Sequence, residues 1–123
     1  MPDRRAVLGV RGEDAAARFY QSAGYTVLAR NWRCAEGEID LVVRHPTGEV
    51  LVFCEVKTRT GAAFGSPFEA VTPLKQRRLR RLARRWLATA RPPGARADRL
   101  RFDVAAVSAR NGSLELDVLE DAF

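Results

Sequence analysis

The stretch from residue 50 to residue 59, VLVFCEVKTR, constrains the fold more than any other part of the chain. Apolar side chains occupy both sets of alternating positions at its start, so that both faces of a strand formed here would be buried. The pattern therefore predicts a central strand of a sheet. Glu55 and Lys57 follow on one face of the same strand. Charges at such buried positions are costly unless they are paired or bound to something.

Two interpretations of these charges are open. Glu55 and Lys57 are neighbours on one face and can neutralise each other. Upstream, however, GEIDLVV (37–43) is a second apolar run that carries Asp40, and the turn PTGE (46–49) predicts a hairpin that brings Asp40 near Glu55. Two carboxylates with one lysine repel each other and suit a hard divalent cation with oxygen ligands. The surplus negative charge favours a metal site.

Length and charge bound the class of protein. A chain of 123 residues is expected to form a single domain over 1–123 that stands without disulfides. The net charge of +6 favours a polyanionic partner without identifying one. Cys34 and Cys54 lie in no metal-like spacing and are expected to be free thiols. Because neither a membrane span nor a secretory signal is visible, we expect a cytoplasmic protein with no membrane contact.

A first helix is predicted over residues 5–23, where small and aromatic residues recur at helical spacing and Gly24 supplies a stop. Glu13 lies within it. From the residues alone, Glu13 is most simply a surface acid that pairs with Arg11 or Arg18.

A second helix is predicted from Pro73 to about Ala90, with Thr72 as its N-cap. Leucines, Ala83 and Trp86 form its apolar stripe, and the rest of its surface is basic without one acid. Like charges one turn apart destabilise a helix, so this surface indicates a polyanion that screens the repulsion; a merely solvated face is the alternative. The basic side chains are Lys75, Arg77, Arg78, Arg80, Arg81, Arg84 and Arg85.

Strands are predicted over 25–33, 100–107 and 114–120 in addition to the two already described. The segment 58–71 is rich in Gly, Ser, Thr and Pro and is predicted as a loop beside the charged site. The order of helix, three strands, helix and two strands predicts an α/β fold: a mixed sheet of five strands with one helix on each side.

The spacing D-x14-E-x-K resembles the core of the restriction-endonuclease-like, PD-(D/E)xK, nucleases. The whole chain resembles the uncharacterised YraN-like bacterial family, which is related to archaeal Holliday-junction resolvases. The similarity runs through the blocks RGEDAAARFY, NWRCAEGEIDLV, EVKTR, FGSPFEAVTPLKQRRL, RFDVAAV and EDAF. Ile39 replaces the proline of the pattern's name, which leaves the ligand itself unchanged.

This resemblance implies a restriction-endonuclease-like fold and an endonuclease that hydrolyses DNA phosphodiester bonds, with branched or junction DNA as the expected substrate. Asp40 and Glu55, with the carbonyl of Val56 and with Glu13, would hold one or two Mg²⁺ or Mn²⁺ ions. Lys57 would orient the attacking water or stabilise the developing negative charge. By the same resemblance Glu13 joins the catalytic residues Asp40, Glu55 and Lys57, and Gln76 is a candidate to line the site.

The basic helix and the loop before it would bind the DNA backbone, since phosphate contacts need no aromatic platforms. The resemblance to resolvases also implies a homodimer when the protein acts. Two other classes stay open: a nucleic-acid-binding module that keeps the fold without cleaving, and a protein whose basic helix docks an acidic partner. The expected nucleic-acid contacts are Arg59, Lys75, Gln76, Arg77, Arg78, Arg81 and Arg84.

Overall fold

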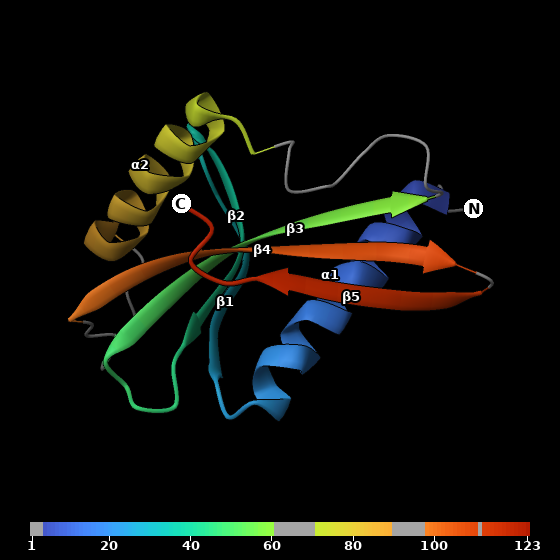
Figure 1. Ribbon diagram of the computed structural model, residues 1–123. Coiled ribbons are helices and arrows are strands. Elements are labelled where there is room, and N and C mark those ends of the chain that lie inside the picture. The colour runs from blue at the N-terminus through green and yellow to red at the C-terminus, as the bar shows by residue number, and fades with distance from the viewer. Residues whose placement is uncertain (1–3, 61–70, 90–97, 111) are drawn as a thin grey trace.

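The computed structural model describes residues 4–60, 71–89, 98–110 and 112–123 (Figure 1). Its elements follow the predicted order and confirm the α/β class, and each predicted helix agrees with the observed one to within one residue at either end. The central strand continues to Thr60, so residues 58–60 extend it instead of belonging to the predicted loop, and residues 61–70 lie outside the described residues. The elements are α1 (Arg4–Ser22), β1 (Thr26–Cys34), β2 (Gly37–Arg44), β3 (Val50–Thr60), α2 (Pro73–Thr89), β4 (Arg99–Arg110) and β5 (Ser113–Leu119).

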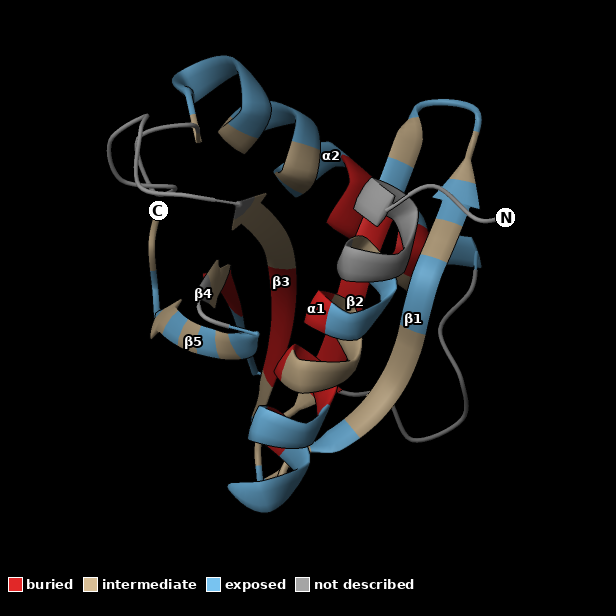
Figure 2. Cartoon of the chain, turned by 90° about the vertical axis from the view of Figure 1, so that its right-hand side faces the viewer, coloured by how far each residue is buried: buried red, intermediate tan, exposed pale blue. Residues whose placement is uncertain are grey.

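The five strands form one mixed sheet in the order β1-β2-β3-β4-β5. All neighbours are antiparallel except β3 and β4, which run parallel. A parallel pair needs a crossover connection, and α2 lies in the segment that joins these two strands. β3 is the middle strand, and its residues 51–54 are all buried, which confirms the predicted central strand (Figure 2).

The two helices cover opposite faces of the sheet, as the pattern predicted (Figure 1). Successive side chains of a strand point to opposite faces. In β3, Leu51 and Phe53 accordingly pack in one core with Trp86 of α2, while Val52 and Cys54 pack in the other core beside α1. A strand with two buried faces fixes the register of the sheet, because a shift by one residue would exchange the two cores.

The first turn of α2 is held by the predicted cap. The Thr72 carbonyl accepts a hydrogen bond from the Gln76 N–H at 2.9 Å, and its hydroxyl accepts one from the Lys75 N–H at 3.3 Å. Pro73 opens the helix, where its missing N–H costs nothing. This cap fixes where the first turn of α2 stands over the sheet.

Some of the basic side chains of α2 have tertiary partners that the sequence did not predict. The β1–β2 hairpin contributes Glu36, whose carboxylate pairs with Arg85 at 2.8 Å and whose carbonyl accepts a hydrogen bond from Arg78. Arg80 lies with its guanidinium carbon 4.9 Å from the centroid of the Phe102 ring. Part of the expected uncompensated repulsion is therefore compensated by tertiary partners.

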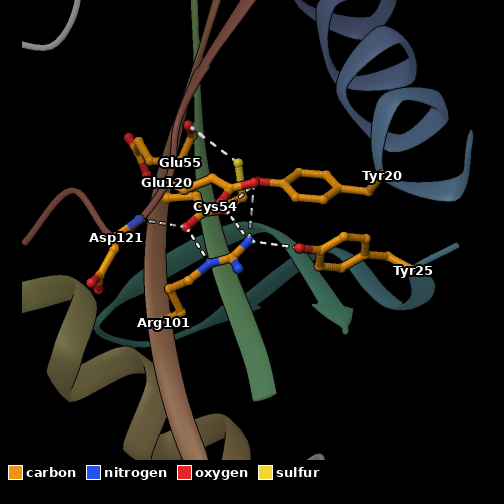
Figure 3. A network of polar contacts seen from close by, with 8 residues as sticks. Tyr20, Tyr25, Cys54, Glu55, Arg101, Glu120 and Asp121 are labelled. Carbon is orange, nitrogen blue, oxygen red and sulfur yellow. Dashed lines mark hydrogen bonds and ion pairs between the residues drawn. The ribbon is translucent and has the colours of Figure 1, made fainter. Parts of the chain in front are cut away.

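A buried ionic network, which the sequence analysis missed, joins α1 to β4 (Figure 3). Asp103 is 0% exposed and accepts hydrogen bonds from the Tyr20 hydroxyl at 2.7 Å and from Arg101 at 2.9 Å through both of its oxygens. Arg101 also donates to the Tyr25 hydroxyl at 3.0 Å. Burial raises the pKa of Tyr20, which keeps its hydroxyl a donor. The network stabilises the helix on the sheet and lies on the face opposite α2.

Among the helices that the structure describes, none is long and apolar enough to cross a membrane.

Candidate active site

The candidate site begins where β2 and β3 stop pairing through their main chains. The last pair of this ladder is Leu41 with Cys54. Directly beyond it, the Asp40 carboxylate replaces a main-chain partner and accepts a hydrogen bond from the Val56 N–H at 2.8 Å. The predicted hairpin therefore places Asp40 beside β3, next to Glu55, as the sequence indicated.

A hollow of about 230 Å³ opens at this point, between the end of β3 and the first turns of α2. It contains three of the four predicted catalytic residues, and two leucines of the α2 stripe supply its apolar wall. The lining residues are Glu38, Asp40, Glu55, Lys57, Lys75, Arg78, Leu79 and Leu82. Another hollow of about 280 Å³, between α1 and β1, contains none of the predicted site residues and includes the Arg30–Asp14 ion pair.

Asp40 has the most perturbed carboxyl group of the site. Burial raises its pKa from 3.8 to about 7, with the negative charge of Glu55 as the next cause. Glu13 and Glu38 raise it further, while the hydrogen bond from Val56 opposes the shift. In the free protein near neutral pH, this group is therefore poised between binding a proton and binding another cation.

Glu55 and Lys57 form the local pair that the sequence left open: the Lys57 Nζ lies 3.1 Å from Glu55 Oε1. This pair accounts for one carboxylate only. No cationic side chain in the described ranges forms an ion pair with Asp40. Asp40 is thus the additional carboxyl group of the site, and it has no ion-pair partner among the described residues.

Lys75 reaches the same hollow from the first turn of α2. The positive charge of the neighbouring Lys57 lowers the pKa of Lys75, with burial and the charge of Arg59 as further causes, while the negative charge of Glu55 opposes the shift. The sequence placed Lys75 among backbone contacts, but the structure places it with the catalytic candidates.

Glu13 stands apart from the hollow that the other three residues line. It is half-buried on α1, which packs against the other face of the sheet. The helix approaches the end of β3 closely, since a Cβ on Gly12 would meet the Thr58 hydroxyl at 2.5 Å. Glu13 is near enough for its charge to raise the pKa of Asp40, so its predicted role as a ligand stays a prediction.

The remaining predicted residues divide into two groups. Gln76 does not line the hollow, and its side-chain amide donates to the Val71 carbonyl at 3.2 Å. Val56 enters the site through its N–H, and a role for its carbonyl stays a prediction. Arg78 lines the hollow. The other predicted contacts lie outside it: Arg59 is half-buried at the end of β3, and Arg77, Arg81 and Arg84 are exposed on α2.

Glu38 is a site residue that the sequence analysis missed. It lines the hollow two positions before Asp40 on the same face of β2, and it pairs with Arg33 at 3.0 Å. The signal was available, because alternation puts residues 38 and 40 on one face.

The donor set fits a divalent ion that keeps most of its own water. No group of three or more His, Cys, Asp or Glu side chains suited to a metal occurs in the described ranges. Mg²⁺ is commonly bound through one or two carboxylates together with waters and substrate phosphates. Asp40 and Glu55 match that arrangement, and a cation between them would relieve the repulsion that raises the Asp40 pKa.

Comparisons with known proteins give a family. Residues 12–107 match the uncharacterised protein family UPF0102. A UPF0102 protein of Parafrankia sp. (strain EAN1pec) is 52% identical over 117 residues, which cover 94% of this chain and 95% of that protein. The UPF0102 protein SCO5602 of Streptomyces coelicolor is 57% identical over 98 residues, which cover 76% of this chain and 74% of that protein.

Among solved structures, Pyrococcus furiosus SfsA in complex with Ca²⁺ is similar at a TM-score of 0.31 and 9% identity, over 90% of this chain and 62% of that one. A similarity this weak carries no argument about the site. The sequence matches show the family: the chain belongs to the uncharacterised protein family UPF0102.

Proposed function

We propose that this protein is a metal-dependent endonuclease of the restriction-endonuclease-like type that hydrolyses phosphodiester bonds of DNA. The observation that carries the proposal is the convergence of Asp40, Glu55 and Lys57 on one hollow, with the Asp40 pKa raised to about 7. Perturbed titratable groups gathered in a hollow are typical of functional sites. An ion pair built only for stability would not need the additional buried carboxylate.

Each residue of the hollow has a role in such a reaction. Asp40 and Glu55 would hold Mg²⁺ or Mn²⁺, which when bound stabilises negative charge on the phosphate and lowers the pKa of a bound water. Glu55 holds the Lys57 ammonium at 3.1 Å, so that its remaining N–H groups can donate to a phosphate oxygen or to the attacking water. The apolar wall of Leu79 and Leu82 limits the water that surrounds these charges.

The exposed arginines of α2 support DNA as the substrate. Arg77, Arg81 and Arg84 lie on the helix whose first turns form one wall of the hollow. Their positive charges would attract a DNA backbone to the helix that carries them. Branched or junction DNA is the finer proposal, and it rests on the resemblance to resolvases.

A cleavage assay tests the proposed function. Junction, flap, single-stranded and duplex DNAs are incubated with the protein and Mg²⁺, Mn²⁺ or excess chelator. We expect cleavage with the metals and none with chelator, and we expect Asp40→Asn to abolish cleavage while DNA binding survives. Equal cleavage in chelator, or full activity of Asp40→Asn, would overturn the proposal.

A non-cleaving nucleic-acid-binding module is the second candidate. The observation that favours it is the pairing of Lys57 with Glu55, which satisfies both groups without a substrate. This candidate predicts salt-sensitive DNA binding with no cleavage of any of the four DNAs with either metal.

A further inference from the structure

The chain contains only two lysines, Lys57 and Lys75, beside nineteen arginines. Both line the hollow that holds Asp40 and Glu55, although they come from different elements. Lys57 lies on β3, and Lys75 lies in the first turn of α2. A sequence that otherwise uses arginine for positive charge thus places its lysines together at one site.

The two ammonium groups are not neutralised equally. Lys57 pairs with Glu55 at 3.1 Å. No acidic side chain in the described part of the chain forms an ion pair with Lys75. Its strongest electrostatic neighbour is Lys57, which repels it, and Arg59 adds to the repulsion; the Glu55 carboxylate, which already pairs with Lys57, offsets only part of it. Holding like charges together is unfavourable unless an anion joins them.

The place of Lys75 also favours an anion. The first turn of a helix lies at the positive end of the helix dipole, which stabilises a nearby negative group. Lys75 lies in that turn of a helix of 17 residues, Pro73–Thr89. The positive charge of the lysines and the positive end of the helix therefore both favour a bound anion.

Lysine suits this hollow for a chemical reason. An arginine has a planar fork that pairs with carboxylates through two parallel hydrogen bonds, so an arginine at position 57, beside Glu55, would hold both oxygens of that carboxylate. A lysine ammonium is a compact point charge with three donors that can rotate toward a phosphate. Two lysines can thus share the hollow with the carboxylates without blocking them.

We propose that Lys57 and Lys75 together bind a single phosphate group of the nucleic acid, so that Lys75 belongs to the site of the reacting phosphate rather than to the backbone-binding surface of α2. This inference rests on the proposed function for the identity of the ligand. The bound chemistry is a phosphate oxygen set, supplied either by an internal phosphodiester or by a phosphorylated chain end.

Reductive methylation with ¹³C-formaldehyde tests joint phosphate binding by Lys57 and Lys75, called the clamp below. The reaction labels only the two lysines and the α-amino group. Lys57→Arg and Lys75→Arg assign the signals. Inorganic phosphate is titrated in chelator at constant pH and ionic strength. We expect both lysine signals to shift with the same half-saturation, and Lys75→Gln to weaken the response of Lys57 at least tenfold.

Arg99→Gln is the matched control. It removes one positive charge from the start of β4, seven residues along the parallel ladder from the partner of Lys57 and so about 20 Å from it. We expect its phosphate response to equal that of the wild type. A shift of only one lysine signal, unequal half-saturations, or an unchanged Lys57 response in Lys75→Gln would overturn the clamp.

Two further arms separate the sources and the proposals. The protein is titrated with a dinucleotide that carries a 5′-phosphate and with one that does not. If the lysines bind a phosphorylated chain end, only the phosphorylated dinucleotide shifts their signals. If they bind an internal phosphodiester, both dinucleotides do. Joint phosphate binding in a protein that cleaves no DNA would leave the clamp standing and the endonuclease proposal refuted. Cleavage by a protein whose lysines respond separately would do the reverse.

Discussion

Asp40 keeps a carboxyl group where it is only 9% exposed and faces another carboxylate. Its pKa rises from 3.8 to about 7 on folding, so the folded protein binds this proton more tightly than the unfolded chain does. The stabilisation from this proton is complete below pH 4 and is lost as the pH rises through 7. A shift of about three units corresponds to at most about 4 kcal/mol of unfolding free energy.

We therefore expect the metal-free protein to lose stability between pH 5 and pH 8, and Asp40→Asn to be the more stable protein at pH 8. The asparagine oxygen can still accept the hydrogen bond from Val56. Urea unfolding at both pH values measures the difference, with the exposed Asp117→Asn as control. A pH slope in Asp40→Asn equal to that of the wild type would contradict the burial and charge assigned to Asp40.

Divalent cations should restore the stability that Asp40 loses. An ion that binds only the folded protein adds to its unfolding free energy by mass action. At pH 8 we expect Mn²⁺ to raise the melting temperature of the wild type and to leave that of Asp40→Asn unchanged. A shift of equal size in both proteins would place the ion elsewhere.

The two lysines should act as a unit in cleavage. Removing a single donor to a reacting phosphate costs on the order of 10²-fold in rate. If Lys57 and Lys75 hold the same phosphate, the double variant of Lys57→Gln and Lys75→Gln should lose much less than the product of the single losses. Independent, multiplicative losses in single-turnover assays would assign the lysines to different phosphates.

Breaking the Arg101–Asp103 ion pair should lower the free energy of unfolding without directly changing the hollow. Asp103→Ala leaves the 7% exposed guanidinium of Arg101 with little compensation, which costs about 3–5 kcal/mol. Glu120 lies 3.9 Å from the same guanidinium and is exposed, so Glu120→Gln should cost less than about 1 kcal/mol. Urea unfolding compares the two variants, and equal costs would show that Asp103 is not the main partner.

At the scale of the element, the arginines of α2 fall into two groups: those with a protein partner and those exposed to solvent. Arg85 is held by Glu36 at 2.8 Å, whereas Arg77, Arg81 and Arg84 are exposed. If about four phosphates are neutralised, the logarithm of DNA affinity falls against the logarithm of salt with a slope near −3.6. The triple variant Arg77→Gln, Arg81→Gln and Arg84→Gln should reduce this slope by up to about 2.7 while keeping the helix.

Arg85→Gln is the control for this helix, because its charge already has a partner. We expect it to leave the salt slope unchanged. Binding of the triple variant with the affinity and slope of the wild type would make the exposed side of α2 a solvated face.

The sequence predicted the features that depend on neighbouring residues and missed those that depend on residues far apart in the chain. Alternation, the Thr72 cap and Gly24 act locally, and they placed every helix and strand. The Glu36–Arg85 pair joins residues 49 positions apart, which no local pattern indicates. Asp103 occupies an alternating position that looks solvent-facing until Tyr20 of α1 covers it.

The candidate site was also predicted only in the part that depends on residues close together in the chain. Asp40 and Glu55 met as expected because a short hairpin fixes their separation. The approach of Lys75 to Lys57 depends on how the crossover sets α2 over the parallel strands, which spacing alone does not determine.

At the scale of the whole molecule, the sheet presents the proposed site once. The hollow with Asp40 and Glu55 lies beside the central strands, and these two carboxylates can form one such site in each chain. Cutting two strands of a junction symmetrically needs two such sites. We therefore expect two copies of the 13.7 kDa chain on each junction, as the resemblance to resolvases also implies.

Light scattering of the protein with and without junction DNA measures the number of copies, and a mixed dimer sharpens the test. Wild type and a tagged Asp40→Asn chain are co-expressed and the mixed species is isolated. Because each copy would cut one strand, the mixed dimer should nick the junction without resolving it, while the wild-type dimer makes paired cuts. Paired cuts by the mixed species, or a single chain on each junction, would overturn the dimer and with it the symmetric, resolvase-like form of the reaction, but not metal-dependent cleavage itself.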